Sequence, residues 1–143
     1  MLMGEYAHSV DAKGRVIFPA DFRAEVGETF IATKGLDNCL FLYSNEEWEL
    51  LSGKLKALPM AKAEARAFAR FFFSSARKME CDKQGRFLIP ANLRQHAKLG
   101  KEAVLIGVSN RIEVWSKEEW TRYNEDINPS VSELAETLAD LGI

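Results

Sequence analysis

The stretch DAKGRVIFPADFR, Asp11 to Arg23, returns as DKQGRFLIPANLR, Asp82 to Arg94, after an offset of 71 positions. The aspartate, the glycine, the arginine after it, the proline, the next alanine and the final arginine are identical. Four further positions exchange one apolar residue for another. A repeat of this length at a fixed offset predicts that the chain contains two copies of one structural unit.

The similarity continues beyond this motif. YSNEEW, Tyr43 to Trp48, returns as WSKEEW, Trp115 to Trp120, and the S-x-x-E spacing in both is typical of a capped helix start. Each unit therefore predicts a turn, a short apolar strand, a proline-started helix, two strands and a capped helix. The predicted boundaries are repeat 1 at 5–47, connecting helices at 48–75, repeat 2 at 76–119 and an acidic helical tail at 120–143.

The opening turn of each unit has a physical explanation. Asp11 and Asp82 suit the first position of a tight turn, where a carboxylate accepts nearby backbone N–H groups. Gly14 and Gly85 suit a position that needs positive φ. These four residues are predicted to shape the turns. Between the two units, residues 61–78 predict one further helix with an apolar stripe.

Neither unit is large enough to close a core alone. Two related units with strands on short hairpins can complete each other's sheets, which also removes unpaired strand edges. We therefore expect an α+β fold with β-rich repeats, forming one barrel-like body with approximate internal twofold symmetry and peripheral helices.

Composition limits the function classes. The 143 residues carry a net charge of −2, yet the charge is segregated: residues 62–86 hold seven bases against three acids, and residues 113–143 hold eight acids against two bases. A polyanion responds to such a local field rather than to the total. There is neither a secretory leader pattern nor an apolar run of membrane length, and the two cysteines have no CxxC spacing, so a cytoplasmic location with reduced thiols is expected.

Catalytic signatures are missing from the sequence. Asp11 and Asp82 could form a carboxylate pair, but a turn role explains them better, and no nucleophile–histidine–acid grouping recurs. There is no zinc-ligand spacing and no glycine-rich phosphate loop. We expect no enzyme activity, no metal, no cofactor and no small-molecule substrate.

The arginines that follow the glycines are the strongest binding candidates. Arg15 and Arg86 each offer a planar fork that can grip phosphate or the O6/N7 edge of guanine. The alternative is that each pairs with its own motif aspartate and only ties the loop, and spacing leaves both possibilities open. Lys13 and Lys83 add charge to the two loops at positions that do not align. The final arginines, Arg23 and Arg94, are expected to be structural.

The doubled D-x-x-G-R-Φ-x-Φ-P pattern (Φ, apolar), the LRQHAKL after the second copy and both S-x-E-E-W starts resemble the MraZ family of bacterial transcriptional regulators, which contain two SpoVT-AbrB domains. The resemblance implies two AbrB-like repeats whose swapped hairpins form a barrel within one chain. It also implies DNA-binding roles for four residues, namely Lys13, Arg15, Lys83 and Arg86.

The resemblance extends to partners. It implies a ring-shaped homo-oligomer that binds double-stranded DNA at short repeated promoter boxes. The implied target is the cell-division and cell-wall gene cluster, with repression of the protein's own operon and association with the nucleoid. Three alternatives stay open: an AbrB-type antitoxin that holds a toxin with residues 128–143, a ring-forming scaffold without DNA function, and, more remotely, a small-molecule enzyme.

Overall fold

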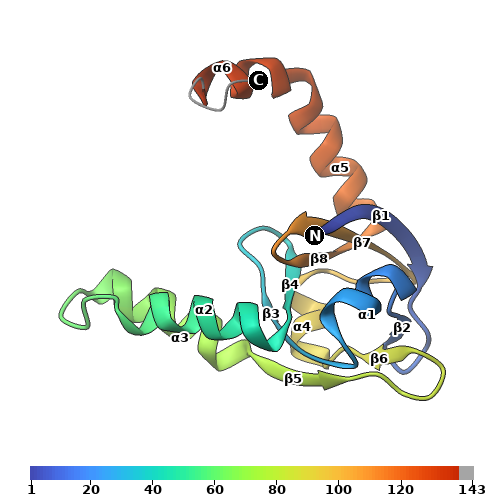
Figure 1. Cartoon of the computed structure of the whole chain (residues 1–143). Coiled ribbons are helices and arrows are strands. Elements are labelled where there is room, and N and C mark those ends of the chain that lie inside the picture. Colours follow the sequence, from blue (N-terminus) through green and yellow to red (C-terminus); the bar gives the residue numbers. More distant parts are fainter. Residues whose placement is uncertain (139–143) are drawn as a thin grey trace.

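A computed structural model describes residues 1–138 of the chain. Antiparallel strands form a six-stranded sheet and a separate two-stranded ribbon (Figure 1). In spatial order the large sheet contains β1 (Leu2–Ser9), β7 (Glu102–Ser109), β8 (Ile112–Ser116), β4 (Cys39–Tyr43), β3 (Thr29–Lys34) and β5 (Arg77–Glu80). The ribbon pairs β2 (Arg15–Ile17) with β6 (Arg86–Leu88). The predicted α+β class and the predicted strands after both glycine–arginine pairs are confirmed.

The two repeats exchange their first strands. β1 of the first repeat pairs with β7 of the second, and β5 of the second pairs with β3 of the first. β4 and β8 meet in the middle of the sheet, so the strand order is the same from either end when the repeats are interchanged. The expected internal twofold relation is therefore present in the pairing.

The strand pairing neither confirms nor contradicts the expected closure of the sheets into a continuous barrel. Among the described residues, one isolated bridge, Val10 with Val16, joins the ribbon's first strand to the end of β1. The six-stranded sheet and the ribbon otherwise keep separate ladders.

Four helices follow the repeat pattern. α1 (Ala20–Val26) and α4 (Ala91–His96) start directly after the two motif prolines. α2 (Asn45–Lys56) and α5 (Lys117–Ile127) start after Ser44 and Ser116, whose hydroxyl oxygens accept the backbone N–H of Glu47 at 3.1 Å and Glu119 at 3.0 Å. These bonds satisfy N–H groups that a helix start leaves unpaired, and the predicted capped starts are confirmed.

The helix predicted over 61–78 is shorter than expected. α3 (Ala63–Ser75) ends before Arg77, because Arg77 and the next three residues pair with β3 as β5. A sheet ladder has therefore taken residues whose local pattern favoured helix.

Two helical arms leave the sheets in different directions (Figure 1). α2 and α3 form one arm. The other runs through α5, a 3₁₀ turn (Asn128–Ser130) and α6 (Val131–Thr137). The end of the predicted tail, residues 139–143, lies outside the described residues. No helix within residues 1–138 is long and apolar enough to cross a membrane.

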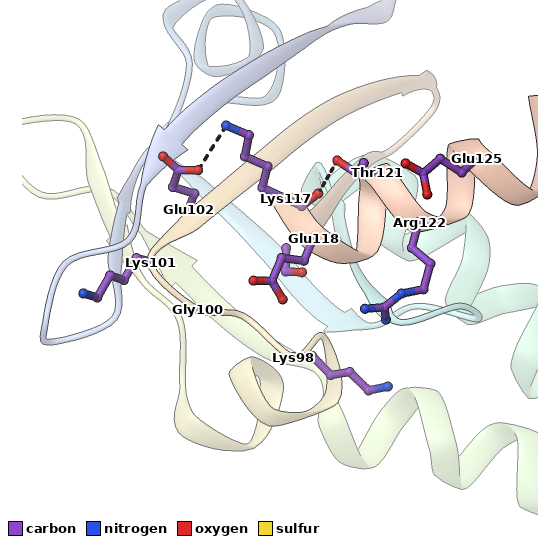
Figure 2. Close-up of a pocket in the computed structure, with 10 residues that line it drawn as sticks. Lys98, Gly100, Lys101, Glu102, Lys117, Glu118, Thr121, Arg122 and Glu125 are labelled. Atoms are coloured by element: carbon purple, nitrogen blue, oxygen red, sulfur yellow. Dashed lines mark hydrogen bonds and ion pairs between the residues drawn. The ribbon is translucent and has the colours of Figure 1, made fainter.

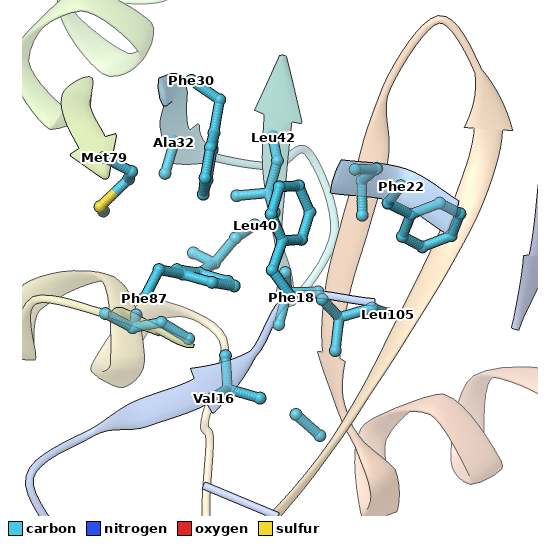
Figure 3. Packing of buried hydrophobic residues seen from close by; sticks show 14 of the residues in the cluster. Val16, Phe18, Phe22, Phe30, Ala32, Leu40, Leu42, Met79, Phe87 and Leu105 are labelled. Carbon is cyan, nitrogen blue, oxygen red and sulfur yellow. The ribbon is translucent and has the colours of Figure 1, made fainter. Parts of the chain in front are cut away.

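The large sheet buries side chains on both faces. Leu40 and Leu42 of β4 join one apolar cluster, whereas Phe41 between them joins another. The first cluster lies beneath the ribbon, where the Phe87 ring meets Phe30 edge to face at 5.3 Å between centroids (Figure 3). Val16 and Phe87 of the ribbon are both about 1% exposed. This cluster therefore fixes which face of the ribbon points outward.

Candidate nucleic-acid interface

The first loop is closed around the Asp11 carboxylate. One oxygen accepts the backbone N–H of Lys13 at 3.0 Å and of Arg15 at 2.9 Å. The other accepts Nε–H of Arg15 at 2.7 Å. The Gly14 N–H donates to the Asp11 carbonyl at 3.0 Å, and Gly14 has a φ of 89°. This positive φ favours glycine over any residue with a Cβ.

The second loop repeats this arrangement. Asp82 accepts the backbone N–H of Gln84 at 2.9 Å and of Arg86 at 2.9 Å, and its second oxygen accepts Arg86 Nε–H at 2.9 Å. Gly85 has a φ of 76°. Because two loops 71 residues apart have the same bonds, the repeated letters encode one local geometry.

Each aspartate ties its arginine through Nε alone. Within the described part of the chain, the terminal Nη nitrogens of Arg15 and Arg86 make no hydrogen bond. The two side chains are 32% and 28% exposed. The two alternatives for these arginines are thus compatible in geometry: the carboxylate holds one edge of the guanidinium, and the other edge remains available for a bidentate acceptor.

The charge of each loop follows from the same bonds. The backbone N–H of Arg15 holds the pKa of the Asp11 carboxyl below its ordinary value, and the N–H of Arg86 does the same for the pKa of Asp82. Both carboxylates are therefore ionised near neutral pH, and each aspartate–arginine pair is neutral overall. The exposed Lys13 and Lys83 supply the loops' excess positive charge.

Contacts between the repeats hold the two loops together. The Gly14 carbonyl accepts the N–H of Ile89 at 2.9 Å, and the Gly85 carbonyl accepts the N–H of Phe18 at 2.8 Å. Each loop is therefore anchored on the strand of the other repeat.

The last arginine of each motif also crosses to the other repeat. The Arg94 guanidinium covers Gly14, the Arg23 guanidinium covers Gly85, and a Cβ at either glycine would overlap the arginine above it. Arg94 Nη1 additionally donates to the Ile89 carbonyl. Sequence identity singled out these arginines, but it gave no indication of the glycines they cover.

The ribbon brings Arg15 and Arg86 to one face. Val16 pairs with Phe87, and both point into the core. Side chains alternate along a strand, so the neighbours on both strands point outward. Arg15 lies opposite Leu88, and Arg86 lies opposite Ile17. The two arginines are therefore diagonal neighbours, which in sheets stand about 7–8 Å apart.

Two members of this outward face did not emerge from the sequence as candidates. Ile17 is 45% exposed and Leu88 is 53% exposed. Strand alternation around Val16 and Phe87 is the signal that identifies them, but only once the inward partner is known.

A hollow lined by charged side chains lies between the α4–β7 turn and α5 (Figure 2). Three of its cations already have partners: Lys117 pairs with Glu102 at 3.2 Å, and Lys98 and Arg122 pair with Glu119 at 3.7 Å and 2.9 Å. Residues 1–138 contain no cluster of three or more histidine, cysteine or acidic side chains that could hold a metal ion. The outer ribbon face is the candidate site, because it brings together two arginines whose Nη edges are exposed.

Comparison with known proteins covers the whole chain. A family model described as "MraZ protein, putative antitoxin-like" matches residues 1–71 and 72–141. Proteins named "Transcriptional regulator MraZ" from Thermoanaerobacter sp. (strain X514) and Alkaliphilus oremlandii (strain OhILAs) are 60% and 61% identical, with 100% of both chains covered. A protein of the same name from Heliobacterium modesticaldum is 57% identical over the same span.

Proposed function

The chain belongs to the MraZ family, and on that premise we propose that it regulates transcription by binding specific sequences in double-stranded DNA, without enzymatic activity. Relatives about 60% identical over their full length carry the name of transcriptional regulators. This name supports the class of function, and the outer ribbon face supports the mode of binding.

The observation that carries the proposal is the outward pair of arginine forks. A guanidinium held through Nε keeps its Nη edge in a defined orientation, which suits bidentate contact with guanine O6 and N7 in the major groove. Lys13 and Lys83, at the two loops, would contact phosphates on either side. The groove admits a two-stranded β-ribbon, so β2 and β6 would enter it together. In this proposal the ribbon closes the body as a barrel, which keeps the four side chains in register.

One chain offers few phosphate contacts, so we propose that several copies bind together as a ring. Identical loops at a fixed pitch match short promoter boxes repeated at one spacing. The proposed target is the protein's own operon in the cell-division and cell-wall gene cluster, which it would repress from the nucleoid in the cytoplasm.

The two arms suggest how neighbouring copies contact each other. A groove between α2 and α3 is lined by apolar side chains and by basic ones, among them Lys56, Arg66 and Arg70. The α6 arm carries acids and three exposed apolar residues at helical spacing, namely Val131, Leu134 and Leu138. The charges of the two arms are opposite, and the arms leave the sheets in different directions (Figure 1). We propose that α6 of one copy occupies this groove of the next.

The decisive experiment on DNA binding is a footprint of the purified protein on the DNA upstream of its own gene, followed by gel shifts with Arg15→Ala and Arg86→Ala. A bidentate base contact is worth about 1–3 kcal/mol, so each substitution should weaken binding by about 5-fold to 150-fold while circular dichroism stays unchanged. Arg122→Ala, an exposed arginine on α5, is the matched control. Unchanged affinity, or wild-type binding that does not weaken steeply with salt, contradicts the proposal.

Native mass measurement tests the contact between copies. Leu134→Glu should reduce the oligomer, and Leu50→Glu, on an exposed position of α2, should not. The antitoxin alternative predicts a different result: wild-type protein would co-purify with a small toxic partner, and Leu134→Glu would release that partner without changing the mass of the purified chain.

A further inference from the structure

The outward face of the ribbon contains an apolar pair that folding does not require. The inward positions of β2 and β6 are filled by Val16 and Phe87, which complete the core. Ile17 and Leu88 point the other way and leave about half of their surface in water. Each stands directly opposite an arginine: Ile17 faces Arg86, and Leu88 faces Arg15.

We propose that Ile17 and Leu88 contact the C5-methyl groups of thymines in the major groove, which makes them specificity-determining residues of the DNA site. The inference rests on the proposed function, since it assumes that the ribbon enters the groove. The thymine methyl is the apolar feature that distinguishes T from the other bases there, and apolar side chains read it by contact. Each arginine and the apolar residue opposite it then form one reading pair.

The spacing of the pair fits adjacent base pairs. Directly opposed side chains in an antiparallel ladder have Cβ atoms about 4.5–5.5 Å apart, and base pairs rise about 3.4 Å per step along each strand. An arginine on a guanine therefore places its opposed apolar side chain over the neighbouring base pair or the one after it. The internal twofold relation repeats this guanine–thymine unit in inverted orientation for the other pair.

Charge complementarity places DNA, rather than another apolar surface, over these two residues. The two loops and the arginines that cover their glycines hold six bases, namely Lys13, Arg15, Arg23, Lys83, Arg86 and Arg94. The two acids in the loops pair with Arg15 and Arg86, which leaves four bases in excess, namely Lys13, Arg23, Lys83 and Arg94. An apolar pair framed by this many cations suits a partner that has both negative charge and exposed methyl groups.

Removal of thymine methyl groups from the DNA tests the inference without changing base pairing. The probe is the fragment protected in the footprint, synthesised either with thymine or with deoxyuridine inside the protected region. Each methyl group that the protein touches should contribute about fourfold to the affinity, from the transfer free energy of one buried carbon. Wild-type protein should therefore bind the deoxyuridine fragment about 15-fold more weakly if Ile17 and Leu88 touch one methyl group each.

The variant Ile17→Ser/Leu88→Ser should bind both fragments equally, with affinity close to that of wild type on deoxyuridine DNA. Leu50→Ser is the matched control, and it should preserve the wild-type preference for thymine. Deoxyuridine placed outside the protected region should have no effect.

Four outcomes overturn the inference. Equal affinity of wild type for both fragments removes methyl reading but leaves DNA binding intact. A double variant that keeps the wild-type preference for thymine assigns the methyl contact to other residues. An altered native mass of the double variant makes Ile17 and Leu88 a contact between copies. Failure of wild type to bind any upstream fragment removes the proposed function together with this inference.

Discussion

Substitution of Gly14 by alanine tests the contact between the repeats, because it places a methyl group where the Arg94 guanidinium lies. Two costs should add. The positive φ of 89° is unfavourable for alanine by about 1–2 kcal/mol. The added methyl also displaces Arg94 from its hydrogen bond to the Ile89 carbonyl, and a bond from a charged donor contributes about 1.5–3 kcal/mol. The expected loss of unfolding free energy is therefore about 2.5–5 kcal/mol.

The chain provides a control that separates the two costs. Gly27 has a φ of 97°, and a Cβ there would meet nothing within 4 Å. Gly27→Ala should therefore lose only a backbone part, which is about 1–3 kcal/mol because a ψ of −179° puts Gly27 in a region that is nearly restricted to glycine. In the double variant Gly14→Ala/Arg94→Ala the overlap is gone, so its total loss should fall short of the sum of the single losses.

Urea unfolding followed by circular dichroism measures all four variants, at one protein concentration because association shifts apparent stability. The reasoning is refuted if Gly14→Ala loses no more than about 2 kcal/mol, the most that the backbone part alone should cost. It is also refuted if the losses of Gly14→Ala and Arg94→Ala are simply additive, since the guanidinium would then have no energetic link to the glycine.

Further substitutions test the core, the loop carboxylates and the thiols. Phe87→Ala should lower the free energy of unfolding by about 3–5 kcal/mol. Leu88, the next residue in the chain, lies on the outward face, so Leu88→Ala should change the free energy of unfolding by no more than about 0.5 kcal/mol. Equal losses in urea unfolding would mean that the inward and outward faces of the ribbon are misassigned. For Asp82, whose pKa is depressed below the ordinary 3.8 in the folded chain, the stabilisation is present above that value and is lost as the pH falls through the depressed pKa. Wild type should thus be more stable than Asp82→Asn at neutral pH, and the difference in unfolding free energy should shrink below about pH 4. A difference that does not depend on pH would contradict a stabilising contact between Asp82 and Arg86. Burial raises the pKa of the Cys39 thiol to about 12 and the pKa of the Cys81 thiol to about 11. Iodoacetamide at about pH 8 should therefore label Cys81 of the native protein slowly and Cys39 more slowly still, as measured by mass spectrometry. Faster labelling of Cys39 than of Cys81 would contradict the deeper burial of Cys39.

Local chemistry explains why the sequence predicted the elements. The serine caps, the prolines at helix starts and the glycine turns each act within a few residues, so Ser44 and Ser116 place their helix starts without knowledge of the fold. The sequence repeat then predicted that the two units form the same helices and strands.

Pairing between the units could not be derived in the same way. β5 takes Arg77 and Lys78 from a segment whose pattern favoured helix, because β3 offers them a ladder. Arg94 covers Gly14 across 80 positions of sequence, and nothing near either residue indicates the other. Ile17 and Leu88 were missed for the same reason: their outward orientation depends on which neighbours the core takes. The strand pairing, the arginine–glycine contacts and the outward face of the ribbon thus depend on contacts between residues far apart in the sequence, which local sequence patterns do not predict.

Joining two copies in one chain has a consequence for recognition. Two identical units that associate as separate chains must present identical loops, and their site must be palindromic. Here β2 of one unit pairs with β6 of the other inside a single chain, so the two loops can change independently. They have done so: Lys13 aligns with Gln84, Lys83 aligns with Ala12, and Ile17 aligns with Leu88.

The features that have not diverged are those that fix geometry, namely the tie to aspartate, the glycine and the arginine that covers it. If the ribbon reads DNA as proposed, the half-sites recognised by Arg15 and Arg86 should share the guanine–thymine unit and differ at positions outside it. Transfer of one lysine from the first loop to the second, Lys13→Gln with Gln84→Lys, should then alter the phosphate contacts on each side and leave the preferred bases unchanged.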